Sequence, residues 1–338
     1  MRLFLKRILL FFLLPLALLA GLYVVTDPYK TLRPFSLTYF DSTNRDYLSS
    51  ELFILNSKEI DYDSFIFGSS RACGINSYHW VHYLPEGSRQ FVFQAWGETI
   101  TGIDQKVRYL DETGVSIKNA LILLDVPRSL DKVQEPTEAL SIKDPAISKQ
   151  PKFVHESILF WDFIQKPSQW TRAVKRYRKK PYVGFDTVSN DWEKGNKDLD
   201  ITVPPSPDSL NRLSKTAKKA FLKNLTANDG VTVNSPLITS TLVRRLESIR
   251  SVFDKHETSW RIIVTPGFCY KDPAISPDDL TILQQVFGAE NVFDYSRKNE
   301  WNSDYNNYTD PNHFGLGVGW MMIEEIYNAS PRIVEKLK

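Results

Sequence analysis

Two short segments, far apart in the chain, hold the residue types that nucleophilic catalysis requires. In the segment 65–71, Phe-Ile-Phe-Gly-Ser-Ser-Arg, Ser70 offers a hydroxyl that attacks esters when a base takes its proton. Asp310 and His313 lie three residues apart in the segment 308–314, where a carboxylate can fix the tautomer of an imidazole and stabilise its cation. Each segment also has a plain alternative: an ordinary turn after a strand, and a helix-capping Asp followed by an incidental His.

These segments need a scaffold that brings them together, and the sequence predicts an α/β domain. Short apolar runs alternate with amphipathic stretches, as in a βαβ series. Ser70 would then follow the first strand at the carboxyl edge of a parallel sheet, where α/β proteins build their sites. The five predicted strands are Ser64–Phe67, Gln90–Ala95, Ala120–Asp125, Trp260–Thr265 and Asn291–Asp294.

Helical periodicity marks the segments between and after these strands. Apolar residues recur with a helical period in the segments 101–112, 210–225 and 242–253. The second of these follows a Pro-Asp-Ser cap at 207–209. The segment 315–328 is expected to form a helix that begins just after His313.

A serine after the first strand and Asp-x-x-His before the last helix resemble the first and last sequence blocks of the SGNH/GDSL hydrolases. The resemblance covers about Asp61 to Asn328 and implies a flavodoxin-like three-layer sandwich with a parallel sheet. It implies that Ser70 is the nucleophile, His313 the general base and then acid, and Asp310 the residue that orients it. Ser69 stands where the family usually has Asp, a departure also seen in its membrane-anchored acyl-transfer branches.

The family builds its oxyanion hole from the nucleophile's own backbone N–H, a glycine in its second block and an Asn in its third. Gly97 matches that glycine, whose N–H would contribute roughly 3–4 kcal/mol; a plain turn glycine is the alternative. The segment 124–128 reads Leu-Asp-Val-Pro-Arg and has no Asn. An ionised Asp125 would repel an oxyanion, so we interpret it as structural, with a protonated Asp125 or Arg128 as alternative helpers.

An uncharged apolar stretch, Ile8–Val25, lies near the N-terminus and is long enough to span a bilayer. Three basic residues precede it, so the positive-inside rule places the N-terminus in the cytoplasm and the rest of the chain outside. We therefore predict that residues 1–27 form a cytoplasmic tip and a single-pass signal anchor in the inner membrane. A cleaved signal peptide is the alternative, although Val24-Val25-Thr26 offers no small-x-small cleavage site.

Beyond the anchor, the sequence is interpreted as one domain with an insertion. Residues 28–60 are predicted to be a juxtamembrane segment, irregular from Tyr29 to Glu51, and residues 61–330 the catalytic domain. A polar, basic, Trp-rich insertion at about 131–205 is a candidate cap over the site. Its cations and aromatics would suit sugars or anionic head groups. A solvated basic helix face with core-facing aromatics is the plainer interpretation, so none of these residues is assigned to a site.

Composition adds little about partners. The chain has 42 Lys and Arg against 40 Asp and Glu, a balance that gives no reason to expect binding to nucleic acid. With five scattered histidines and no Cys-x-x-Cys, no metal or other cofactor is expected. Cys73 and Cys269 would be able to form a disulfide outside the cytoplasm, and the sequence leaves their pairing open.

Together these features predict a membrane-anchored serine esterase or O-acyltransferase that acts on acyl esters, acetyl above all, of a cell-envelope polysaccharide. A multi-pass membrane acyltransferase is a candidate partner, because the anchor would hold the domain near an acyl donor. Whether transfer or removal dominates stays open. One alternative is a glycan-binding or assembly subunit with the same fold and little turnover, and another is a lipid esterase or thioesterase.

Overall fold

The computed structural model describes residues 2–33, 44–130, 142–177, 185–192, 232–269, 272–310 and 312–327. The chain divides into two compact units. The first combines Met1–Leu52 with Glu135–Val183, and the second combines Phe53–Gln134 with Gly184–Lys338. The first unit buries an apolar core of its own, whereas the sequence analysis expects one domain with an insertion beyond the anchor.

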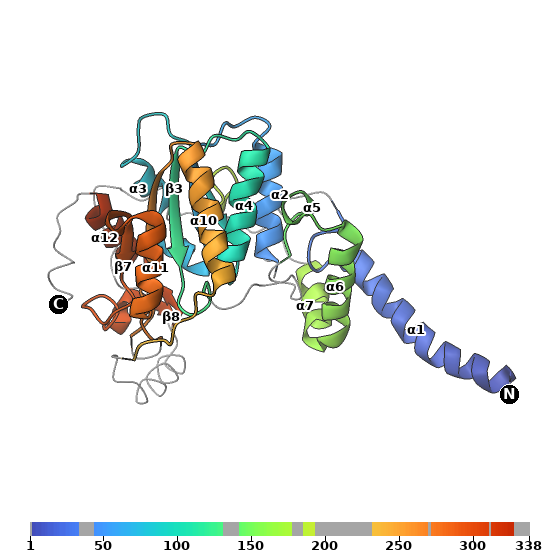
Figure 1. Cartoon of the computed structure of the whole chain (residues 1–338). Coiled ribbons are helices and arrows are strands. Elements are labelled where there is room, and N and C mark those ends of the chain that lie inside the picture. The colour runs from blue at the N-terminus through green and yellow to red at the C-terminus, as the bar shows by residue number, and fades with distance from the viewer. Residues whose placement is uncertain are drawn as a thin grey trace. The chain divides into compact units, whose positions relative to one another are not determined.

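The first unit is helical in its described part. It contains α1 (Arg2–Thr26), the start of α2 (Arg45–Asn56), α5 (Pro145–Ser148), α6 (Lys152–Gln165) and α7 (Pro167–Tyr177). Figure 1 shows α6 and α7 packed together beside the C-terminal end of α1. Their shared core includes Tyr23, Tyr29, Leu159 and Phe163. Among the residues that the structure describes, no helix has the length and hydropathy of a membrane span.

The segment Tyr29–Glu51 was predicted to be irregular, but its C-terminal part forms the first half of α2. This helix begins at Arg45, where the Asn44 side chain accepts the backbone N–H of Tyr47 at 3.3 Å. Leu48 and Leu52, four residues apart, are both buried. Serines and charged residues between these apolar positions weaken the helical pattern, which is why the sequence alone suggested a loop.

The second unit is built on a five-stranded sheet whose neighbouring strands are all parallel. The strand order is β2-β1-β3-β6-β7. This is the doubly wound order of a flavodoxin-like fold, with the first strand between the second and third. All five predicted strands are confirmed, with small shifts at their ends: β1 Ser64–Gly68, β2 Gln90–Gln94, β3 Asn119–Leu124, β6 Ser259–Val264 and β7 Val292–Asp294.

Helices cover both faces of this sheet. Phe65 contacts the Phe53 ring of α2, and Phe67 stacks on Phe93, over which Lys106 of α4 (Ile100–Glu112) lies. Helix α4 packs beside α10 (Ser240–Lys255) on this face, as Figure 1 shows. Ile66, one residue out of phase, points to the face covered by α12 (Leu316–Tyr327). The predicted helices 101–112, 242–253 and 315–328 are confirmed, whereas the one predicted at 210–225 lies outside the described residues. The remaining helical elements are η2 (Ser70–Gly74), α3 (Ser77–Val81), α11 (Pro277–Phe287), η6 (Ala289–Asn291) and η7 (Tyr305–Asn307).

Part of the predicted insertion belongs to this second unit and covers the β2 edge of the sheet. A turn joins β4 (Phe185–Asp186) to β5 (Asp191–Trp192). The Val92 N–H donates to the Ser189 carbonyl at 2.8 Å, and the Gln94 side chain donates to the Asn190 carbonyl at 3.1 Å. The turn therefore satisfies backbone groups that an open edge would leave unpaired. The insertion is split between the two units, and a cap over the site stays a prediction.

Two glycines let α12 lie directly on η2, the short helix that follows β1. A Cβ on Gly319 would lie 1.8 Å from the carbonyl oxygen of Gly74, and a Cβ on Gly74 would lie 2.4 Å from the Phe314 ring. Neither position has room for a side chain. The helix that follows His313 is thus held against the helix that begins with Ser70.

We expect Gly319→Ala to lower the free energy of unfolding by about 1–3 kcal/mol, because the new methyl group can only be accommodated by moving backbone. Gln285→Ala, at an exposed position of α11, is the matched control and should change it by less than about 0.5 kcal/mol. Denaturant unfolding of both variants measures this. Equal stability of Gly319→Ala and wild type would contradict the close packing.

Candidate active site

The structure brings Ser70, Asp310 and His313 together. Ser70 begins η2 at the carboxyl end of β1, and the other two lie in a hairpin of β8 (Tyr308–Asp310) and β9 (His313–Phe314). The register pairs Asp310 with His313 across the hairpin, so their side chains lie side by side. Ser70 Oγ is 2.8 Å from His313 Nε2, and His313 Nδ1 is 2.7 Å from Asp310 Oδ2.

The Asp310 carboxylate is suited to orient the imidazole. Burial raises its pKa, but hydrogen bonds from His313 and from the Asn312 N–H, 2.8 Å from Oδ1, outweigh that effect and hold the pKa below its usual value. The carboxylate therefore stays ionised near neutral pH. With Nδ1–H donating to Asp310, Nε2 is left to accept the Ser70 proton. Both side chains remain partly exposed, 33% for His313 and 42% for Asp310, so a substrate can reach them.

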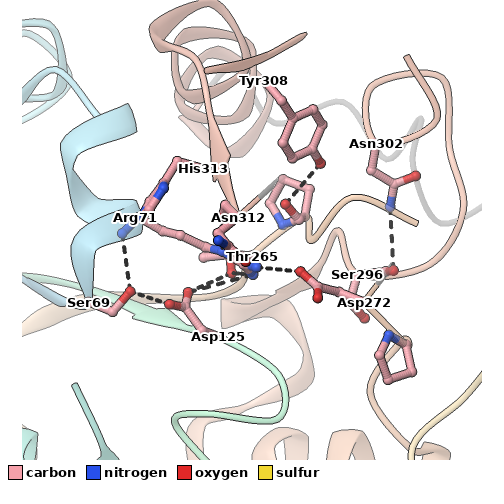
Figure 2. A network of polar contacts seen from close by, with 12 residues as sticks. Ser69, Arg71, Asp125, Thr265, Asp272, Ser296, Asn302, Tyr308, Asn312 and His313 are labelled. Carbon is pink, nitrogen blue, oxygen red and sulfur yellow. Dashed lines mark hydrogen bonds and ion pairs between the residues drawn. The ribbon is translucent and has the colours of Figure 1, made fainter. Parts of the chain in front are cut away.

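A buried polar network lies next to His313 and contains Ser69 and Asp125, which are hydrogen-bonded to each other (Figure 2). Ser69 Oγ donates to one oxygen of Asp125 and accepts the backbone N–H of Arg71 at 3.1 Å. The other Asp125 oxygen accepts the Thr265 hydroxyl at 2.8 Å. Because both carboxylate oxygens are engaged as acceptors, Asp125 ties the loop after β3 to the turn that bears the nucleophile.

Arg71 is the centre of this network (Figure 2). Its Nε donates to the Asn312 carbonyl at 2.7 Å, and its terminal nitrogens reach Asp272 at 2.6 Å and Thr265 at 3.0 Å. Burial lowers the pKa of Arg71, but the charges of Asp125 and Asp272 together raise it, so the guanidinium stays charged. Arg71 directly follows Ser70, and Asn312 directly precedes His313. The hydrogen bond between Arg71 and Asn312 therefore links the two segments that contain Ser70 and His313.

The sequence interpretation missed Arg71, Thr265 and Asp272. Arg71 directly follows the Gly-Ser-Ser turn, and a cation at that position is the sequence signal for such a network. Thr265 ends the fourth predicted strand, and therefore lies at the carboxyl edge of the sheet with Ser70. Asp272 lies in a loop with no local pattern, and only its contact with Arg71 identifies it.

Gly97 lies in the loop after β2 with φ +78°, a conformation that favours glycine. The side chain of Arg128 lies directly against it, since a Cβ on Gly97 would be 2.8 Å from the Arg128 Nε. Ser129 also joins the loop after β2 to the loop after β3. Its hydroxyl donates to the Glu98 carbonyl at 3.0 Å and accepts the Asp125 N–H at 2.9 Å. The loop after β3 thus brings a cation, in place of an Asn amide, beside the predicted oxyanion donor.

The remaining chemistry-bearing residues add no further centre in the part of the chain that the structure describes. No group of three or more His, Cys, Asp and Glu there is placed to hold a metal ion. Cys73 and Cys269 do not form a disulfide with each other. The Cys73 thiol contacts the Gln94 side chain, with 3.1 Å between Sγ and Oε1.

Among known proteins, neither a family model nor a curated protein matches this chain.

We expect the three triad substitutions to differ in effect on labelling by a fluorophosphonate, which reacts only with an activated serine. Ser70→Ala should abolish labelling, and His313→Ala should nearly do so, because an unassisted hydroxyl is a weak nucleophile. Asp310→Asn should stay folded and label orders of magnitude more slowly, because an amide N–H favours the wrong tautomer. Stability should change by about 1 kcal/mol or less. Early melting of all three, with wild-type labelling of the folded fraction, would make these residues structural.

Arg71→Lys tests whether the network positions the triad. Lysine keeps the charge but lacks the planar fork that contacts several acceptors at once. We expect the labelling rate per folded molecule to fall, together with a loss of about 1–3 kcal/mol in unfolding free energy. The matched control is Arg245→Lys, which weakens a 2.6 Å ion pair with buried Asp104 between α10 and α4. It should cost similar stability and leave labelling unchanged. If both variants lose stability and both label at the wild-type rate, Arg71 has a structural role only.

Proposed function

We propose that this protein is an SGNH/GDSL-type serine esterase or O-acyltransferase. The observation that carries the proposal is the continuous hydrogen-bonded series from Ser70 Oγ through the His313 ring to Asp310, with distances of 2.8 Å and 2.7 Å. The parallel sheet supports it, because the nucleophile follows β1 at the carboxyl edge, where such folds build sites. The substrate class we propose is an acyl ester, acetyl above all, of a cell-envelope polysaccharide.

The reaction would proceed through an acyl-enzyme. Ser70 Oγ attacks the acyl carbonyl while its proton passes to His313 Nε2, and Asp310 stabilises the imidazolium. The backbone N–H groups of Ser70 and Gly97 would bind the oxyanion of the tetrahedral intermediate. His313 then returns the proton to the departing alcohol. A sugar hydroxyl or water, activated by the same imidazole, would attack the acyl group and release Ser70.

Location and partner form part of the same proposal. The uncharged stretch Ile8–Val25, with basic residues before it, would anchor the chain once in the inner membrane and place the remainder on the periplasmic side. An enzyme tethered there would stay close to envelope glycans during their export. A multi-pass membrane acyltransferase would be a suitable source of the acyl group.

A second candidate is a glycan-binding or assembly subunit with little turnover. The observation that favours it is the engagement of Asp125, whose two oxygens accept hydrogen bonds from Ser69 and Thr265. No Asn amide is then supplied by the loop after β3 to bind an oxyanion. Loss of one such donor costs roughly 3–4 kcal/mol in comparable sites, enough to slow chemistry strongly.

Envelope glycan acylation in three strains tests the proposal: a deletion strain, the same strain complemented with wild type, and one complemented with Ser70→Ala. Both complementing proteins carry a C-terminal alkaline phosphatase, whose activity reports accumulation and export of the domain. We expect wild type to restore the acylation level and Ser70→Ala to leave it at the deletion level, with equal phosphatase activity.

Restoration by Ser70→Ala would favour the assembly subunit, because binding does not need the nucleophile. An inactive phosphatase on a protein that accumulates normally would contradict the periplasmic location instead. The direction of the acylation change in the deletion strain separates transfer from removal: a loss indicates transfer, and a gain indicates hydrolysis.

A further inference from the structure

Helix α6 of the first unit is apolar on two opposite sides. One side packs Leu159 and Phe163 into the core of the unit. The other side carries Phe153, 72% exposed, and Trp161, 60% exposed, two turns apart with Ser157 between them. A surface helix of a water-soluble protein normally shows polar residues on its outer side. The outer face of α6, defined here by Phe153, Ser157 and Trp161, is therefore suited to an apolar surrounding.

This face lies at the level where the predicted membrane anchor ends. The ring of Tyr23 in α1 is 5.2 Å from the Phe160 ring, and its hydroxyl donates to Glu156 at 3.0 Å. Tyr23 is two residues from the end of the apolar stretch Ile8–Val25, a rise of about 3 Å along the helix. Trp161 directly follows Phe160. Its indole is therefore expected to lie at about the same depth in the membrane as the C-terminal end of the proposed span.

The hairpin formed by α6 and α7 carries an excess of positive charge, which favours a negatively charged binding surface. Residues 151–177 include five basic and two acidic residues. The acidic pair is already engaged: Glu156 accepts the Tyr23 hydroxyl, and Asp162 accepts hydrogen bonds from Tyr29 and Lys166. Exposed cations of the hairpin apart from Lys166 include Lys152, Arg172 and Lys175. Exposed aromatics combined with cations are typical of segments that lie in the headgroup region of an anionic bilayer.

We propose that the outer face of α6 binds the anionic surface of the membrane in which α1 is anchored, with Phe153 and Trp161 in the headgroup region. This inference rests on the proposed anchor and is independent of the triad. Lipid is favoured over a protein partner because the exposed rings are accompanied by an excess of positive charge, which anionic headgroups neutralise.

Fluorescence quenching by brominated lipids tests the proposal on the full chain in vesicles. The vesicles contain phosphatidylglycerol and phosphatidylcholine, brominated near the headgroup end of the acyl chains. We expect Trp161→Phe to lose much of the bromine-dependent quenching seen for wild type. Trp170→Phe is the matched control, because Trp170 is half-buried in the same hairpin and its Nε1 donates to the Phe163 carbonyl at 2.7 Å. This variant should quench like wild type.

The inference would be overturned by a lack of association of the full chain with vesicles, by equal quenching of wild type and Trp161→Phe, or by a Trp161 that is shielded from acrylamide yet unaffected by bromine. The last outcome would assign the face to a protein contact. Quenching should also decrease in pure phosphatidylcholine, and an unchanged value would exclude the role of anionic lipid. Ser70→Ala should quench like wild type, which separates this test from that of the enzymatic proposal.

Discussion

The geometry of the candidate site depends on the burial of one cation, Arg71. A guanidinium taken out of water needs charge and hydrogen-bond partners from the protein, because an uncompensated buried charge costs several kcal/mol. Its partners come from three separate parts of the chain: Asp125 after β3, Asp272 after β6, and the Asn312 carbonyl beside the catalytic imidazole. Satisfying Arg71 therefore holds the turn that contains Ser70 beside the hairpin that contains His313, whereas the register of the hairpin itself pairs Asp310 with His313.

The same network changes how an oxyanion would be stabilised. With Ser69 and Thr265 both donating to Asp125, the carboxylate is committed to holding the nucleophile turn in place. The loop after β3 instead places Arg128 against Gly97. A cation beside a backbone donor favours developing negative charge, whereas an ionised carboxylate would oppose it.

Each of the two units has its own core and its own chemical character. The second unit buries strands on both faces and carries Ser70 and Thr265 at the carboxyl edge of the sheet. The first unit combines the end of an apolar helix with a hairpin that exposes Phe153 and Trp161. Among the described residues, the apolar cluster around Leu159 and Phe163 is made of first-unit residues, and the cluster around Ile66 and Met322 is made of second-unit residues.

The sequence by itself determined the five strands, three of the helices and the residues of the candidate triad, because alternating apolar runs and short catalytic motifs are local signals. It did not predict α2, because serines and charged residues interrupt the apolar pattern of that helix, or the division of the insertion, because that depends on packing between distant segments. Only the tertiary structure decided that Arg71 would hold the site together and that Gly74 and Gly319 would bring two helices into contact. These interactions join residues far apart in the chain, and neither composition nor periodicity predicts which distant groups come into contact.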